Sequence, residues 1–352
     1  MPTLFHPEIG TTPHLDYLHP YAAMPGGEIA LHGRNLGAFS GAPPFITIGD
    51  TPAELAFSRP TQTILRVPEG AISGDIVLHH SGHSSNPLPL RVAVPMAENL
   101  HPVANPAVDA DGAIYATLSG SRGQETPVSI FKIERDLQLR PFVRGLMNPT
   151  GLAFGPDGLL YVSSRAEGAV YRVSPSGDVT TYAEGMGIAT GIAFDPDGNL
   201  YVGDRSGTIF KIARASADGT AGETFVFATL EPSFVAYHLA FNDEGTLFVS
   251  SPTTSSNQAI FAIDHSGDTR IFYRGLGRAQ GMAFDVSGDL YVAASLHGQR
   301  GIVRITPSAE ATLAVSGPNL LGLAFLEDGN AALATREALY HVALDVEGRR
   351  LY

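Results

Sequence analysis

Six copies of one short motif constrain the fold of this chain more than any other feature. They begin at residues 105, 151, 191, 238, 281 and 322 and read NPAVDADGAIYA, GLAFGPDGLLYV, GIAFDPDGNLYV, HLAFNDEGTLFV, GMAFDVSGDLYV and GLAFLEDGNAAL. The turn glycines of successive copies are 46, 40, 47, 43 and 41 residues apart. This spacing is typical of a four-stranded propeller blade. The repeat therefore predicts an all-β, six-bladed β-propeller.

Each column of the repeat has a physical interpretation. An alanine column predicts crowded inner strands and comprises Ala107, Ala153, Ala193, Ala240, Ala283 and Ala324. The next, large apolar column should fill the space between blades: Val108, Phe154, Phe194, Phe241, Phe284 and Phe325. The DPDG-like segments predict tight turns, because Asp bonds its own backbone and Gly tolerates positive φ. Blade six has Ala332 where other blades have an aromatic residue. The terminal residues 349–352 are expected to supply its outer strand.

The region before the repeats predicts a separate sandwich of short strands: EIALHG, FITIG, ILRVPE, GDIVLHH and LPLRVAV. The segment PHLDYLHPYAAMPGGEIALHGRNLG resembles the start of TIG (IPT) domains, and FITIGDTPAEL and VPEGAISGDIVL resemble their later strands. This resemblance implies an immunoglobulin-like spacer or interaction module without catalytic residues. We expect that domain over 12–95, a linker over 96–102 and the propeller over 103–352. The histidines of HHSGHSSN are interpreted as solvated turn residues.

Composition excludes several classes of function. The chain lacks cysteine, which excludes disulfides and thiolate sites. Its formal net charge of −13 argues against general binding to nucleic acid or anionic membranes. The sequence predicts neither a signal peptide nor a membrane-spanning helix, so a soluble, cytoplasmic protein is expected by default.

The segment GIAFDPDGNLYVGDRSGTIFKI resembles NHL repeats and the six-bladed propellers of the gluconolactonase and senescence-marker-protein family. That resemblance implies a divalent cation held by carboxylate and asparagine side chains just before the inner strands. Here the corresponding column contains no carboxylate: Ala104, Thr150, Thr190, Tyr237, Gln280 and Leu321. Hard cations need several oxygen ligands, usually including a charged one. No cofactor is therefore predicted, and a divalent cation belongs only to the alternative of a hydrolase with an altered metal site.

Arginines recur in the loops that should surround one end of the propeller channel. Five of the six blades place one there despite the acidic balance: Arg122, Arg165, Arg205, Arg300 and Arg336. Arginine presents a planar fork of donors suited to carboxylate or phosphate. Tyr237, His238, Gln280 and His297 are predicted to complete this site.

Two interpretations of the arginines stay open. In the alternative interpretation, each arginine pairs with a nearby acid, such as Glu167, Asp204 or Glu337, or packs its stem over a neighbouring blade, and serves only stability. The leading hypothesis is a non-catalytic binding or scaffolding protein for an anionic peptide or small ligand, with no nucleic acid or membrane partner. Such a protein could also be a subunit of a larger assembly. The alternative is a metal-dependent lactonase-type hydrolase.

Overall fold

The computed structural model describes residues 12–37, 43–80, 82–233, 235–250, 257–349 and 352. Two compact units divide the chain: Met1–Val94 with Leu313–Pro318, and Pro95–Thr312 with Asn319–Tyr352. The predicted all-β class is confirmed, because the described residues form strands and no helix. No helix able to cross a membrane therefore occurs in this part of the chain.

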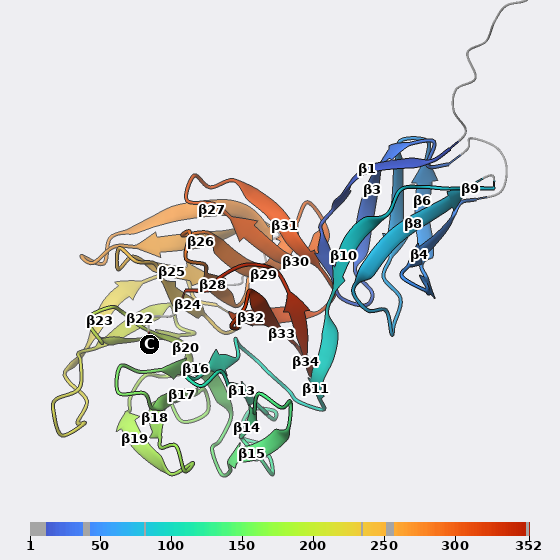
Figure 1. Ribbon diagram of the computed structural model, residues 1–352. Helices are drawn as coiled ribbons and strands as arrows, with labels where there is room; N and C mark the ends of the chain where they lie inside the picture. Colours follow the sequence, from blue (N-terminus) through green and yellow to red (C-terminus); the bar gives the residue numbers. More distant parts are fainter. Residues whose placement is uncertain (1–11, 38–42, 81, 234, 251–256, 350–351) are drawn as a thin grey trace, which may run out of the picture. The chain divides into compact units, whose positions relative to one another are not determined.

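The first unit contains two groups of strands around one apolar core (Figure 1). The first sheet has the order β1 (His14–His19), β3 (Glu28–Arg34), β7 (Gln62–Arg66) and β6 (Glu54–Arg59). The second has the order β2 (Ala22–Ala23), β10 (Leu88–Val92), β8 (Gly74–His80), β4 (Phe45–Ile48) and β5 (Thr51–Pro52), with β9 (His83–Ser84) paired to β8. Alternation along the strands sends Ile29 and Leu31 of one sheet, and Ile76 and Leu78 of the other, into that core.

The six repeats correspond to six groups of four strands, which we call blades 1 to 6. Blades 1 to 3 comprise β12 (Ala107–Val108), β13 (Ile114–Thr117), β14 (Ile130–Ile133) and β15 (Leu139–Val143); β16 (Pro149–Phe154), β17 (Leu160–Ser164), β18 (Ala169–Val173) and β19 (Val179–Ala183); and β20 (Ala189–Phe194), β21 (Leu200–Asp204), β22 (Thr208–Ile212) and β23 (Thr224–Thr229).

Blades 4 to 6 follow the same order. They comprise β24 (His238–Phe241), β25 (Leu247–Ser250), β26 (Gln258–Ile263) and β27 (Thr269–Gly277); β28 (Met282–Phe284), β29 (Leu290–Leu296), β30 (Gln299–Ile305) and β31 (Ala311–Ser316); and β32 (Leu320–Phe325), β33 (Asn330–Thr335), β34 (Ala338–Ala343) and β11 (Val94–Glu98). The first strands of these blades lie near the centre of the unit in Figure 1. Each contacts the first strand of the next blade, and β32 contacts β12, which closes a ring. The β27–β29 pair joins blades 4 and 5 within one larger sheet.

Aromatic contacts join one blade to the next, as the apolar column predicts. Tyr161 of blade 2 packs edge-on against Phe194 of blade 3, with ring centroids 4.9 Å apart. Tyr201 and Phe241 repeat this contact at 4.9 Å between blades 3 and 4. The turn glycines adopt positive φ as expected, for example +84° at Gly198. The repeated residues therefore specify both the turn and the packing between blades.

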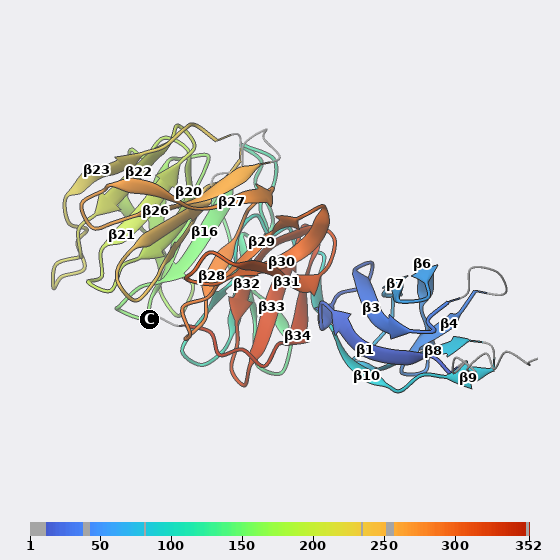
Figure 2. The same cartoon turned by 90° about the horizontal axis from the view of Figure 1, so that it is seen from above.

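The last blade corrects two expectations. Its fourth strand is β11, which precedes the repeats, and Figure 2 shows the other strands of this sheet, β32, β33 and β34, side by side. The predicted linker over 96–102 therefore overlaps a strand, and the assignment of residues 349–352 as the outer strand is wrong. Instead, the Arg349 backbone N–H donates to the Phe284 carbonyl oxygen. The free edge of β34 required a partner, and the chain supplies it from the N-terminal side.

Candidate functional site

A cavity of about 330 Å³ opens among the starts of the inner strands and the loops beside them. Four arginines from different blades or connections line it: Arg165, Arg205, Arg278 and Arg336. The rest of its described lining is uncharged or histidine: His101, Pro102, Val103, Thr150, Thr190, Val235, Ala236, His238, Gln280 and Leu321. We call it the arginine cavity. Its described lining contains no carboxylate.

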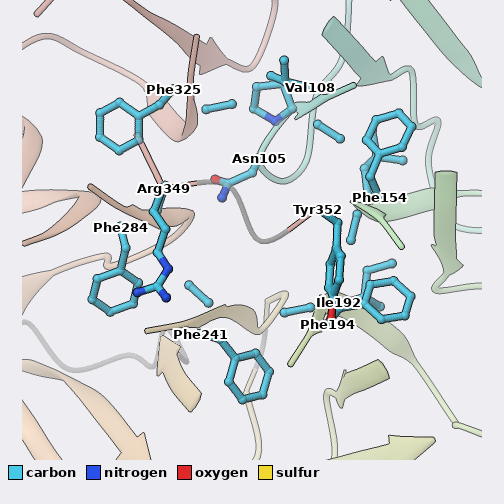
Figure 3. Close-up of a pocket in the computed structure, with 18 of the residues that line it drawn as sticks. Asn105, Val108, Phe154, Ile192, Phe194, Phe241, Phe284, Phe325, Arg349 and Tyr352 are labelled. Carbon is cyan, nitrogen blue, oxygen red and sulfur yellow. The ribbon is translucent and has the colours of Figure 1, made fainter. Parts of the chain in front are cut away.

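A second cavity of about 230 Å³ lies at the other ends of the same strands (Figure 3). Its walls are the alanine and phenylalanine columns of the repeat, together with Asn105, Arg349 and Tyr352. The polar groups here already have partners. Asn105 donates to the Met282 carbonyl oxygen at 2.8 Å, and Tyr352 donates to the Asp195 carbonyl oxygen at 2.7 Å. We call this space the aromatic cavity.

The arginines of the first cavity crowd one another. Burial, followed by the positive charges of Arg205 and Arg122, lowers the pKa of Arg165. One of its terminal nitrogens donates to the Gly120 carbonyl oxygen at 2.7 Å, while its buried Nε has no hydrogen-bond partner among the described residues. Arg205 Nε approaches the Ser233 carbonyl oxygen at 3.4 Å. These contacts position the guanidinium groups without neutralising them.

Glu167 and Asp204 use their carboxylates for contacts with other groups. Glu167 accepts a hydrogen bond from the Tyr171 hydroxyl at 2.7 Å. Asp204 accepts hydrogen bonds from the Ile188 backbone N–H at 2.7 Å and from the Ser206 hydroxyl. These bonds use the Asp204 carboxylate to hold the loop. Over the described ranges, no ion pair within 4.0 Å joins Arg165 or Arg336 to an acid. Ion pairs with Glu167 and Asp204 therefore do not account for these arginines, although backbone carbonyl oxygens also hold Arg165 and Arg205 in place.

His238 is the most deeply buried ionisable group of the cavity wall. It is 5% exposed, and burial lowers its pKa to about 4, so the ring is neutral at pH 7. Within the part of the chain that the structure describes, neither its ring nor the Gln280 side-chain amide makes a hydrogen bond. The Thr190 hydroxyl, in contrast, donates to the Gly203 carbonyl oxygen at 2.8 Å. His238 and Gln280 thus offer unused hydrogen-bonding groups to a ligand.

The structure brings together five of the nine predicted site residues: Arg165, Arg205, His238, Gln280 and Arg336. Tyr237 is wrongly placed by the prediction, because its side chain is 0% exposed and packs in the core between blades. Gly203 leaves room for it, since a Cβ there would lie 2.7 Å from the Tyr237 Cβ.

The other predicted residues lie outside the described lining of the arginine cavity. His297 and Arg300 are exposed on the β29–β30 hairpin, and Arg122 is exposed on a long loop of blade 1. Sequence reasoning missed Arg278, which lies in the connection between blades 4 and 5. The corresponding positions of the other blades carry no arginine, so a search for a recurring residue type could not identify it.

The cavity does not suit the divalent cation that the gluconolactonase resemblance implies. Its described lining supplies two imidazoles, one amide and two hydroxyls, but four arginine positive charges. A divalent cation would meet repulsion without a charged ligand to offset it. Among the described residues, no group of three or more His, Asp or Glu side chains could hold a metal, and this includes the three histidines of HHSGHSSN.

Comparison with protein families gives one match over part of the chain. Residues 161–325 match the SMP-30/gluconolactonase/LRE-like region. No curated protein matches the chain. The gluconolactonase resemblance of the repeats is thus supported over that region.

Solved structures share the fold at low sequence identity. A gluconolactonase from Xanthomonas campestris has a TM-score of 0.58 and 15% identity, covering 72% of this chain and 89% of that one. An auxiliary nutrient-binding protein from Bacteroides thetaiotaomicron has a TM-score of 0.55 and 12% identity, covering 94% and 98%. Another from Bacteroides ovatus has a TM-score of 0.54 and 12% identity, covering 94% and 97%. This protein therefore has a propeller-type fold similar to that of gluconolactonases.

Proposed function

We propose that this chain is a non-catalytic binding protein whose arginine cavity captures an anionic ligand, either a peptide or a small molecule. The observation that carries the proposal is the meeting of four arginines in a cavity whose described lining has no carboxylate. Guanidinium groups bind carboxylate and phosphate through paired hydrogen bonds, and partial burial strengthens such contacts. An anion would offset the repulsion that these residues exert on one another.

We also infer that the second unit is a six-bladed propeller built from NHL-like repeats, and that the first is an immunoglobulin-like module of the TIG type. The ring of six four-stranded blades supports the first inference. The two sheets around one core support the second. In this proposal the TIG-type module acts as a spacer or second contact, and the chain can serve as a subunit of a larger assembly. We propose neither nucleic acid nor membrane as a partner.

The alternative function is a lactonase-type hydrolase with an altered metal site. The match of residues 161–325 to the gluconolactonase-like region favours it. The charge of the arginine cavity argues against it, since a site for a divalent cation requires the opposite sign. A fold does not by itself fix an activity, so the two functions are separated by what the cavity binds.

Melting curves of EDTA-treated protein distinguish these functions. We expect citrate or pyrophosphate to raise the Tm and Ca²⁺, Mn²⁺ or Zn²⁺ to leave it unchanged. A ligand at 100 times its Kd stabilises the folded state by about 2.7 kcal/mol. The variant Arg165→Ala/Arg205→Ala/Arg336→Ala should fold and lose the anion-induced shift. A shift caused by a divalent cation, or an anion-induced shift that survives this variant, would contradict the proposal.

A further inference from the structure

The charges of the arginine cavity are divided between two sides. Arg165 and Arg205 come from the β17–β18 and β21–β22 loops of neighbouring blades 2 and 3. Arg278 comes from the connection into blade 5, and Arg336 from the β33–β34 loop of blade 6. In a closed ring of six, blades 2 and 3 lie opposite blades 5 and 6. The four arginines therefore come from two opposite sides of the ring, Arg165 and Arg205 from one and Arg278 and Arg336 from the other.

Apolar residues line the cavity on the sides of blades 1 and 4. Pro102 and Val103 lie just before blade 1, and Val235 and Ala236 lie just before blade 4. His238 is neutral and, like Gln280, makes no hydrogen bond through its side chain within the described ranges. The cavity thus offers strong cationic contacts at two ends and weaker polar or apolar contacts between them.

Building on the proposed function, we propose that the ligand is a small organic dianion with an acidic group at each end, each held by one arginine pair. A monoanion would leave one pair of guanidinium groups uncompensated. Inorganic phosphate or sulfate is compact and would engage one side at a time. The cavity of about 330 Å³ is at the small end of ligand pockets, which favours a small molecule over an extended acidic peptide.

Isothermal titration calorimetry of the full chain tests this arrangement. The probes are the dicarboxylates glutarate, adipate and pimelate, each compared with the monocarboxylate of the same number of carbons. We expect at least one dicarboxylate to bind at least about tenfold more tightly than its monocarboxylate, a difference of about 1.4 kcal/mol, because its second carboxylate gains charge-assisted hydrogen bonds. The variants Arg165→Gln/Arg205→Gln and Arg278→Gln/Arg336→Gln should each remove this preference.

The matched control is Arg135→Gln/Arg140→Gln, which removes the same charge from two exposed arginines that pair with Glu327 and Glu134. It should keep the dicarboxylate preference. If a double variant fails to fold, the single substitutions Arg165→Gln and Arg336→Gln provide the same comparison.

Four results would overturn the inference. Equal binding of mono- and dicarboxylates, or sensitivity to only one arginine pair, would exclude a two-ended ligand while leaving anion binding itself intact. Tighter binding of a tetraglutamate peptide than of every dicarboxylate would assign the cavity to peptides. Binding of no anion, including citrate and pyrophosphate, would remove the proposed function as well.

Discussion

The two cavities lie at opposite ends of the same inner strands and differ in how their charges are used. Beside the aromatic cavity, the Arg349 guanidinium lies 3.0 Å from an Asp243 carboxylate oxygen. On the same turn side, Lys211 lies 3.8 Å from Asp195. In the arginine cavity, four arginines gather without a carboxylate in the described lining. The turn side is therefore built for stability, whereas the loop side keeps positive charge available.

The difference follows from which residues repeat. The turn side contains the Ala and Phe columns and the Asp–Gly turns, which all blades need in order to pack and reverse direction. Arg165 and Arg205 follow a second strand, and Arg278 lies in a connection. These loops can vary without disturbing the ring. Residues that give this protein its own function are thus expected on the loop side.

The largest effect on stability is expected for a substitution in the inner strands, between the two cavities. A Cβ at Gly191 would meet the Tyr237 carbonyl oxygen and lie 3.0 Å from the His238 Cα. The variant Gly191→Ala should therefore lower the free energy of unfolding by about 3 kcal/mol, measured by urea denaturation. The control is Gly277→Ala, whose Cβ would lie 3.2 Å from the Ser295 Cβ. Equal losses in the two variants would contradict close approach at this level.

A smaller effect concerns pH. The pKa of His238 is lowered to about 4 by burial, so between pH 6.5 and 4 the unfolded state binds a proton that the folded state does not. The free energy of unfolding should therefore decrease as the pH is lowered through that window, by up to about 1.4 kcal/mol per pH unit. The variant His238→Gln should remove this contribution, which paired urea titrations at pH 7 and 5 would measure. Parallel pH profiles for the two proteins would show that His238 is not a buried neutral group.

The smallest effect contrasts one arginine from each end. Losing the ion pair with Asp243 should make Arg349→Gln less stable by about 0.5–1 kcal/mol, because that pair is partly exposed. Arg336→Gln should change stability by less than about 0.5 kcal/mol, because Arg336 is exposed. Only Arg336→Gln should reduce the rise in Tm caused by citrate. The reverse pattern would mean that the two ends had been assigned the wrong roles.

Much of the second unit could be predicted from sequence because its packing repeats. The Phe194 and Phe241 contacts follow directly from column alignment and strand alternation. Strand β11 could not be assigned, because its partner β34 is about 240 positions away and lies outside the repeat. Tyr237 was misassigned because its orientation depends on the space left by Gly203 in the preceding blade. The pairing of β11 and the orientation of Tyr237 both depend on contacts with residues outside the local sequence pattern.

The most direct test of the central claim is a crystal structure with selenate, a dianion that can be located by anomalous scattering. A parallel soak with Mn²⁺ tests the opposite charge. The account predicts a selenate peak in the arginine cavity, within hydrogen-bonding distance of Arg165 or Arg205, and no Mn²⁺ peak there. A Mn²⁺ peak in this cavity, or selenate found only elsewhere on the protein, would contradict it.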